Sequence, residues 1–246
     1  IKLDENTYYS LTVDVKDKNV DNFKIYTRTN ENEPWRRKKV NGEIEQIINE
    51  KLKDFSKIEV NLVGLVDFDL SEGKDYQIKC HQIGDDYTLK YEVKNDTLYI
   101  TQKADKLNLK NNYQNDWLYI TVPKGTKLSS ATINQFSGNV EAASLTIDSA
   151  DIKVDSGNMS FEDCIVENLK STVDSGNAFF TGVKIKNGKA INNAGNVFIE
   201  DVDASNLNAK VSAGNAFLDG ELKGNISINV EAGNIFDECD SDHRRD

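Results

Sequence analysis

The sequence Val-Asp-Ser-Gly-Asn stands at residues 154–158 and returns at residues 173–177, nineteen positions later. The Gly-Asn dipeptide at its end continues this spacing along the chain, and a small Ser or Ala always precedes the glycine. Six glycines follow one another at this step: Gly138, Gly157, Gly176, Gly195, Gly214 and Gly233. An internal period held this strictly indicates a repeat protein in which each repeat stacks on the next.

Apolar positions within each repeat lie two residues apart, which is the period of a β-strand. One apolar column begins directly after the Gly-Asn: Val140, Met159, Ala178, Val197, Ala216 and Ile235. A repeat of this length exceeds an ordinary straight strand, so each repeat must bend. The sequence therefore predicts an all-β fold, a single-chain β-solenoid (β-helix) of 19-residue coils. It favours a right-handed over a left-handed coil.

Glycine and asparagine mark the expected bends, because both tolerate positive φ better than most residues. Identical asparagines stacked at the strand spacing of about 4.8 Å can hydrogen-bond along the stack. We expect one turn ladder at the Gly-Asn corner: Asn139, Asn158, Asn177, Asn196, Asn215 and Asn234. We expect a second column half a coil away: Ser149, Asn168, Asn187, Asn206 and Asn225. In the fifth coil Glu221 and Lys223 occupy apolar positions, which predicts a bulge that lets Leu222 fill the gap.

The residues before the repeats fall into two parts. Residues 55–125 alternate like strands of uneven length, so we expect irregular coils there. They would join the regular repeats of residues 126–239 in one solenoid domain over residues 55–246. Residues 1–54 differ, because two strand patterns at 8–15 and 23–28 precede a helical spacing of Ile44, Ile47, Ile48 and Leu52. This pattern predicts a small α+β or irregular cap or linker, with a short helix near residues 43–53.

The chain is acidic, with 30 Lys and Arg against 41 Asp and Glu, a net charge of −11 and a pI near 4.8. Such a charge repels phosphate backbones, so we expect no nucleic-acid partner. The chain starts at Ile1, and its one methionine is Met159. We interpret the native N-terminus as removed, which leaves room for an export signal or a membrane anchor upstream of residue 1.

Several motifs resemble the bacterial "putative adhesin" family, a domain of unknown function with a β-helix fold. They are Phe55-Ser56-Lys57-Ile58-Glu59-Val60, Gly73 with Tyr76-Gln77-Ile78, Asn95-Asp96-Thr97-Leu98-Tyr99-Ile100, Val122-Pro123 and the recurrent Ser-Gly-Asn turns. The resemblance covers roughly residues 55–240. It implies an architecture rather than an activity, since the family has no agreed catalytic residues. Because the family is frequent in exported or anchored proteins of Gram-positive bacteria, it also implies an extracellular or membrane-anchored protein that faces outward.

The second column after each Gly-Asn contains four phenylalanines in consecutive coils: Phe179, Phe198, Phe217 and Phe236. The columns on both sides are apolar and inward, so we expect the phenylalanines to face outward. The opposite phase would bury Glu162, Glu200 and Asp219, which is costly without partners. One interpretation is a contact surface for a protein, a glycan or a second subunit. The other is that the rings stack on one another and stiffen the solenoid, or that residues 1–54 cover them.

No other group of residues indicates a catalytic or a metal-binding site. Stacked carboxylates such as Asp155 and Asp174 could bind Ca²⁺, but the glycine-rich nonapeptide of calcium-binding β-rolls is absent. Cys80 and His81 are neighbours on a predicted strand and point to opposite faces, which excludes a Cys–His pair. We therefore predict no catalytic residue, no metal and no cofactor.

Three functions remain open at this point. We expect first a non-enzymatic cell-surface or envelope-associated protein, adhesin-like, that binds a protein or glycan along its flank. A carbohydrate-active β-helix enzyme is the second, although the absence of Arg from residues 140–240 weakens its lyase form. The third is a structural scaffold that self-associates end to end, against which the polar residues 240–246 suggest a cap.

Overall fold

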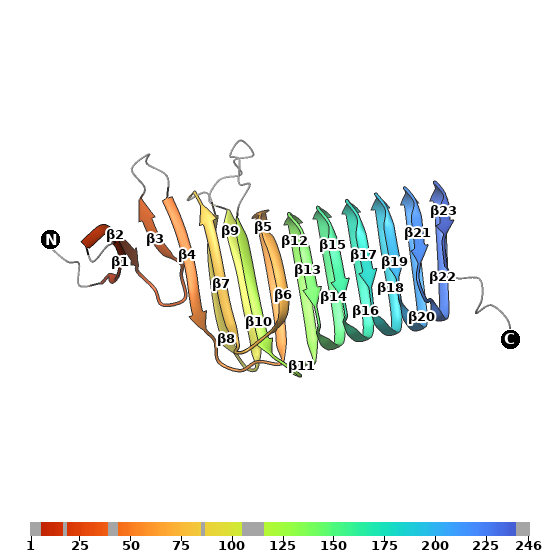
Figure 1. Ribbon diagram of the computed structural model, residues 1–246, viewed down its shortest axis with the longest axis horizontal. Helices are drawn as coiled ribbons and strands as arrows, with labels where there is room; N and C mark the ends of the chain where they lie inside the picture. Colours follow the sequence, from red (N-terminus) through yellow and green to blue (C-terminus); the bar gives the residue numbers. More distant parts are fainter. Residues whose placement is uncertain (1–5, 17–18, 39–43, 85–86, 105–115, 240–246) are drawn as a thin grey trace.

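The computed structural model describes residues 6–16, 19–38, 44–84, 87–104 and 116–239, and these residues form 23 β-strands and no helix. The strands lie across the long axis of an elongated molecule, with β1 (Tyr8–Lys16) and β23 (Ile235–Asp237) toward its opposite ends (Figure 1). They belong to two sheets of 13 and 10 strands, which we name sheet A and sheet B. No helix that could span a membrane occurs in the described ranges. The predicted all-β solenoid with coils of about 19 residues is confirmed.

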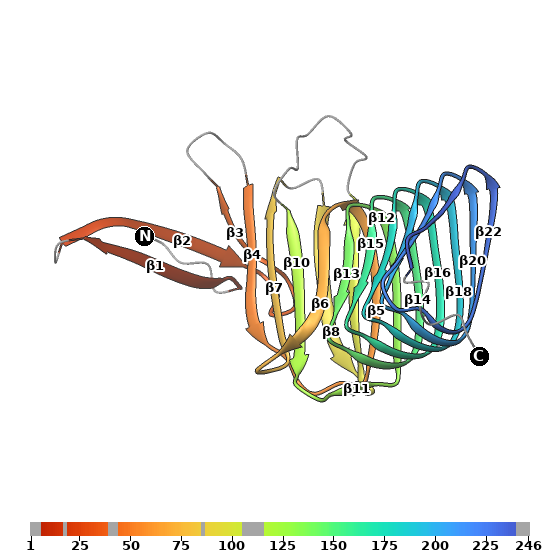
Figure 2. The same ribbon diagram turned by 45° about the vertical axis from the view of Figure 1, so that its right-hand side comes forward.

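Each regular coil contains one short strand in sheet A and one long strand in sheet B. The short strands are β13 (Val140–Ala143), β15 (Met159–Glu162), β17 (Ala178–Thr181), β19 (Val197–Glu200), β21 (Ala216–Asp219) and β23 (Ile235–Asp237). The long strands are β12 (Ser130–Ser137), β14 (Thr146–Ser156), β16 (Ile165–Ser175), β18 (Lys184–Ala194), β20 (Asp203–Ala213) and β22 (Lys223–Ala232). Neighbouring coils pair in parallel with residues nineteen apart opposite each other, as Val140 and Met159 are. Figure 2 shows these coils side by side as flattened loops.

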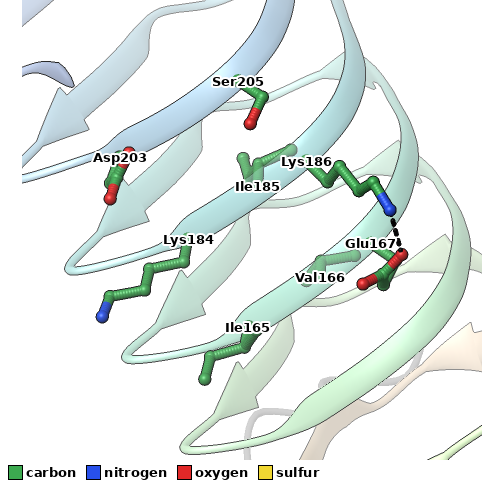
Figure 3. A pocket seen from close by; sticks show the side chains of 8 residues that line it. All are labelled: Ile165, Val166, Glu167, Lys184, Ile185, Lys186, Asp203 and Ser205. Atoms are coloured by element: carbon green, nitrogen blue, oxygen red, sulfur yellow. Dashed lines mark hydrogen bonds and ion pairs between the residues drawn. The ribbon is translucent and has the colours of Figure 1, made fainter. Parts of the chain in front are cut away.

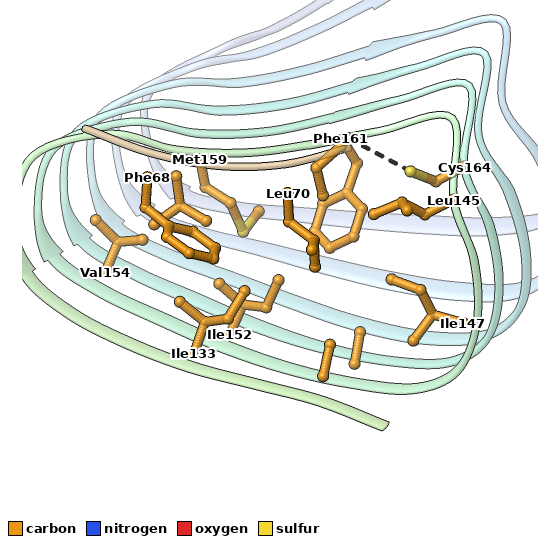
Figure 4. Close-up of a cluster of buried hydrophobic side chains, with 14 of the residues drawn as sticks. Phe68, Leu70, Ile133, Leu145, Ile147, Ile152, Val154, Met159, Phe161 and Cys164 are labelled. Atoms are coloured by element: carbon orange, nitrogen blue, oxygen red, sulfur yellow. Dashed lines mark hydrogen bonds between the residues drawn. The ribbon is translucent and has the colours of Figure 1, made fainter. Parts of the chain in front are cut away.

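The hydrophobic core fills the space between the two sheets inside the coils. Met159 and Phe161 of sheet A are fully buried, and Ile152 and Val154 of sheet B face them across the coil (Figure 4). Like side chains lie over like, as the rings of Phe161 and Phe180 do, with centroids 6.0 Å apart. Burying one such side chain stabilises a fold by about 1.5–3 kcal/mol. Because each coil needs the next to complete this burial, the coils stabilise one another.

The Gly-Asn corner joins each long strand to the next short strand. Gly195 has φ of +137°, and a Cβ built on it would lie 1.8 Å from the carbonyl oxygen of Gly176 in the preceding coil. Only glycine fits such a corner. Each side-chain Oδ1 then accepts a hydrogen bond from the backbone N–H one coil later, and the Oδ1 atoms of Asp67 and Asn196 also accept from a side-chain amide. The N–O distances are 2.9–3.0 Å along the whole ladder, which runs through Asp67, Asn139, Asn158, Asn177, Asn196, Asn215 and Asn234.

A second corner, at a position that the asparagine columns do not mark, joins each short strand to the following long strand. Residues with φ between 50° and 69° occupy it: Ser144, Asp163, Gly182, Asp201 and Gly220. Glycine adopts this conformation freely, and aspartate does so more readily than most residues. The expected second asparagine column lies inside the long strands instead, where Nδ2 of Asn187 donates to Oδ1 of Asn168 at 3.2 Å. Two successive exposed residues, Glu167 and Asn168, show that this column marks a bend within the strand.

The fifth coil contains the expected bulge. Lys223 pairs with Asp203, one residue more than the usual step, whereas Asn225 pairs with Asn206 at the usual step. The extra residue lies in the corner before β22, and Leu222 packs against the core there. β20 leaves one residue unpaired between Ala204 and Asn206, which compensates for the extra residue. The later columns therefore stay aligned.

Three irregular layers precede the regular coils, in an order that differs from the sequence. The layer of β5 (Lys57–Leu65) and β6 (Asp67–Gly73) pairs in parallel with β12 and β13. Next comes the layer of β9 (Thr97–Ala104) and β10 (Trp117–Pro123), also parallel. The outermost layer, β7 (Gln77–Ile83) and β8 (Tyr87–Lys94), is antiparallel to it. The layer of β9 and β10, which comes last in the sequence, is therefore inserted between the other two. The short strand β11 (Lys127–Leu128) pairs with β14.

The N-terminal strands extend sheet A beyond β7 in antiparallel pairs. They are β1 (Tyr8–Lys16), β2 (Asn19–Arg28), β3 (Trp35–Lys38) and β4 (Ile44–Lys51). The expected helix near residues 43–53 is wrong, because β4 pairs with β7 along seven residues from Glu45 to Lys51. The helical spacing of the isoleucines did not decide the structure here, because these residues pair with β7 as a strand. Gln46, on the same side of the strand as the buried Ile48, donates from Nε2 to the carbonyl oxygens of Gly84 and Tyr87 at 2.7 and 2.9 Å.

Candidate functional site

The outer face of sheet A carries four phenylalanines in adjacent coils, which we name the aromatic ladder: Phe179, Phe198, Phe217 and Phe236. Each is the second residue of its short strand, so its side chain points away from the core. Successive ring centroids are 4.7, 4.8 and 5.0 Å apart, and the ring planes agree within 10°. The structure thus brings all four residues together in the expected outward orientation.

The stacking decides which part of each ring a partner can contact. Rings stacked face to face cover their faces and leave their edges toward solvent. A cation–π contact needs an open ring face, and only the two ends of the ladder offer one. These are Phe179, whose neighbour is Ser160, and Phe236 in the last strand. Between them the ladder is an apolar ridge of ring edges.

Carboxylates border this ridge on one side. Glu162, Glu200 and Asp219 end their short strands, are exposed and share one column. Glu141 stands in the ladder's own column nearer the N-terminus, opposite Asp69. Partial burial raises the pKa of Glu141, and the carboxylates of Asp69 and Glu162 raise it further. We name the ladder together with its carboxylates the ladder face: Phe179, Phe198, Phe217, Phe236, Glu141, Glu162, Glu200 and Asp219.

The ladder face contains no compensating cation. The strands β13, β15, β17, β19, β21 and β23 include no Lys or Arg. On sheet B, by contrast, outward carboxylates pair with lysines at 2.8–3.5 Å: Asp151 with Lys170, Glu167 with Lys186, Asp174 with Lys153 and Glu231 with Lys210. Among the described residues, no Lys or Arg forms an ion pair with the four carboxylates of the ladder face. The two flanks of the solenoid therefore differ in charge.

A shallow groove of about 320 Å³ lies where the long strands begin (Figure 3). Its lining consists of Ile165, Val166, Glu167, Lys184, Ile185, Lys186, Asp203 and Ser205. Lys186 Nζ lies 3.0 Å from Glu167 Oε2, so the charge at its centre is already compensated. The lining includes neither a histidine nor a cysteine.

Cys80 and His81 point to opposite sides of β7, as the strand alternation requires. Burial raises the pKa of the Cys80 thiol far above its ordinary value, so this thiol is not a nucleophile at neutral pH. His81 Nε2 lies 3.4 Å from Glu45 Oε1, and the other oxygen of Glu45 pairs with Arg37 at 2.8 Å. In the part of the chain that the structure describes, no three His, Cys, Asp or Glu side chains come together as a metal site.

An aromatic cluster on the same face of sheet A was missed from the sequence. The rings of Trp117 and Tyr119 on β10 stack 4.5 Å apart, and His81 stacks on Trp117 at 6.1 Å. Their spacing of two residues was a visible signal. No local pattern, however, indicates that β10 lies beside β6 and so shares a face with the ladder. The absence of Lys and Arg from the short strands was equally visible and was overlooked.

Solved structures with a similar chain path come from bacteria, at low sequence identity. A protein named "putative adhesin" from Bacteroides fragilis NCTC 9343 is 18% identical, with a TM-score of 0.46 over 78% of this chain and 96% of that one. A "putative cell adhesion protein" from Clostridium sporogenes ATCC 15579 is 14% identical, with a TM-score of 0.37 over 80% and 99%. A "putative lipid binding protein" from Parabacteroides distasonis ATCC 8503 is 15% identical, with a TM-score of 0.38 over 78% and 96%. No curated protein shows a significant match to the chain.

Residues 55–241 match the Toastrack DUF4097 domain, a family of unknown function. The matched region begins just before β5 and ends just after β23, so it contains every layer of the solenoid. Strands β1 to β4 lie outside it. The match agrees with the resemblance that the Ser-Gly-Asn turns and the motifs of residues 55–123 indicated. The chain therefore belongs to the Toastrack DUF4097 family.

Proposed function

We propose that the protein is a non-enzymatic binding module of the bacterial cell surface or envelope, which holds a protein partner on its ladder face. The partner would present a strip of apolar side chains flanked by lysines or arginines. The stacked coils supply a stiff flank, and the partner associates with it without any bond being made or broken.

One observation carries this proposal: an unbroken apolar ridge lies beside carboxylates that no Lys or Arg of the described residues neutralises. Exposed apolar surface marks interaction sites. Like charges stacked on neighbouring strands repel one another. A partner with basic and apolar side chains would relieve both costs at once. We favour a protein over a glycan because the stacking occupies the ring faces between the two ends of the ladder.

The placement at the surface or envelope belongs to the same proposal. It is supported by the family resemblance, which implies exported or anchored proteins. Proteolysis of intact cells tests it, since an outward-facing protein is cleaved by added trypsin before the cells are lysed. Protection of the chain until lysis would contradict this placement.

Photocrosslinking in the native host tests the binding face. Phe198 is replaced by the photoreactive p-benzoylphenylalanine, and illumination should give a discrete protein adduct on a denaturing gel. Phe136 on β12 is the matched control, because it is a phenylalanine that is 48% exposed on the opposite sheet. The same replacement there should give no adduct.

Charge reversal tests the acidic border. Glu200→Lys should remove most of the adduct formed at position 198, because it repels a basic partner. Glu59→Lys, at an exposed carboxylate on β5 of sheet B, should leave the adduct unchanged. Equal adducts at positions 198 and 136, or no adduct at 198, would refute the binding face. An adduct that persists with Glu200→Lys would refute a basic partner.

A further inference from the structure

In the part of the chain that the structure describes, the C-terminal end of the solenoid is open. Within the described residues, β22 pairs only with β20 and β23 only with β21, so each leaves one backbone edge unpaired. The inward side chains there are incompletely covered: Ile228 is half-buried, while Ala209 one coil earlier is fully buried. Ile235 is 49% exposed, whereas Ala216 beneath it is fully buried. An open strand edge over an exposed core is a template for another strand.

At the opposite end sheet B is covered, whereas sheet A ends at β1, which pairs only with β2 among the described residues. The segment between β2 and β3 lies against β8, the last strand of sheet B. There the backbone N–H of Tyr91 donates to the carbonyl oxygen of Asn32 at 3.4 Å, and Lys90 pairs with Glu33 at 3.1 Å. The Tyr91 hydroxyl also donates to Glu50 at 2.9 Å. These contacts block the β8 edge, so head-to-tail stacking cannot continue through sheet B at this end.

We infer that two copies of this chain join end to end, with their β22 strands antiparallel and centred on Ser227. A two-fold axis normal to sheet B achieves this and makes the two patches self-complementary. The inward side chains of both copies stay inward only when the axis passes through one residue, so that this residue lies opposite the same residue of the second copy. A register centred between two residues would set Ile226 and Ile228 opposite outward side chains and expose them.

Charge selects among the registers that preserve the core. With the axis at Ser227, Lys223 lies opposite Glu231 of the second copy, and the reverse pair forms on the other side of the axis. These contacts would add to the pairs within each chain, Lys223 with Glu221 and Glu231 with Lys210, both at 2.8 Å. Ile226 then lies opposite Ile228. With the axis at Ile228 instead, Glu231 faces Asn225 and the charges are not matched. Opposite charges directly across an antiparallel pair are favourable.

The result is a closed dimer with one continuous core, not an open scaffold. Residues 240–246, expected from the sequence to act as a cap, lie outside the described residues. Their sequence, Asp-Ser-Asp-His-Arg-Arg-Asp, contains no apolar side chain. The dimer does not depend on the proposed function. It would, however, set two ladder faces on the same side of one rod.

Mass measurement by light scattering across a dilution series tests the dimer. The chain of 27.6 kDa should run at twice this mass at high concentration and dissociate on dilution. Lys223→Glu and Glu231→Lys should each weaken the dimer about tenfold, because two opposed pairs become repulsive. The double swap Lys223→Glu/Glu231→Lys should restore it. A monomer at every concentration, or a double swap no better than the singles, would overturn the inference.

Disulfide trapping tests the register, in a Cys239→Ser background that removes the thiol near the same end. Ser227→Cys brings two Cα atoms within about 5.5 Å, which is inside disulfide range. Asn229→Cys, the matched control, sets the two Cα atoms on the order of 13 Å apart. Oxidation should crosslink the first variant and not the second. Equal crosslinking, or a dimer that appears only after residues 240–246 are deleted, would also overturn the inference.

Discussion

Replacing the corner glycine Gly195 by alanine should destabilise the solenoid more than a glycine-to-alanine change where a Cβ has room. Its φ of +137° lies in a region that is nearly closed to residues with a Cβ, at a cost of about 1–3 kcal/mol. The added Cβ would also stand 1.8 Å from the carbonyl oxygen of Gly176, so the two coils must separate. Forced backbone shifts of this kind cost about 1–3 kcal/mol. The sum, about 2–6 kcal/mol, is a large share of a typical domain stability of about 5–15 kcal/mol.

Gly125→Ala is the matched control. Gly125 also has positive φ, +79°, but a Cβ there would meet nothing within 4 Å. Only the free-energy cost of holding a residue with a Cβ at positive φ remains, about 1–2 kcal/mol. Urea unfolding followed by far-ultraviolet circular dichroism measures both variants against the parent chain. Equal midpoints for Gly195→Ala and Gly125→Ala would refute the close approach of carbonyl and Cα that the stacked corners require.

Three further predictions concern the ladders and one buried acid. Asn196→Ala leaves the backbone N–H of Asn215 without its acceptor at 2.9 Å and should cost about 1–3 kcal/mol; Asn196→Asp should cost less in the same urea assay, since Asp67 already accepts from Asn139 in this way. Phe198→Ala removes two ring contacts and should lower the thermal midpoint more than Phe236→Ala, which removes one ring contact from a side chain that is 44% exposed; equal shifts would show that stacking adds no stability. Burial raises the pKa of Asp116 to about 6, against about 3.9 in an unfolded chain. Its ionisation therefore removes stability as pH rises from about 4 to about 6, and Asp116→Asn should abolish that fall in urea midpoints measured across this range; identical pH profiles for the variant and the parent would contradict it.

The regular coils could be predicted from the sequence because each repeat places the same residue type in the same environment. Val140 and Met159 occupy one column in the sequence and lie opposite each other in the structure. The outward direction of Phe198 followed from the inward neighbours on both sides of it. The corner at Ser144, Asp163 and Gly182 was missed because different residue types satisfy the same positive φ there. A search for identical residues passes over such a column.

The irregular layers could not be predicted in their spatial order. Nothing local in residues 97–123 shows that β9 and β10 insert between two earlier layers, because the order depends on pairings far apart in the sequence. The same cause explains the error at β4. Its isoleucines fit a helix face when considered alone, but in the structure seven residues of β4 pair with the edge of β7. Tertiary pairing therefore decides the structure wherever the repeat does not.

Deletion of one whole coil tests the central claim most directly, namely that nineteen residues make one physical turn. Removing residues 177–195 joins Gly176 to Asn196, restores the Gly-Asn corner and leaves every column in register. The shortened chain should keep its β-sheet circular dichroism and unfold cooperatively, whereas deletion of residues 178–195, one residue fewer, should abolish cooperative unfolding by turning the inward side chains outward. If the two deletions unfold alike, the stacked-coil account is contradicted.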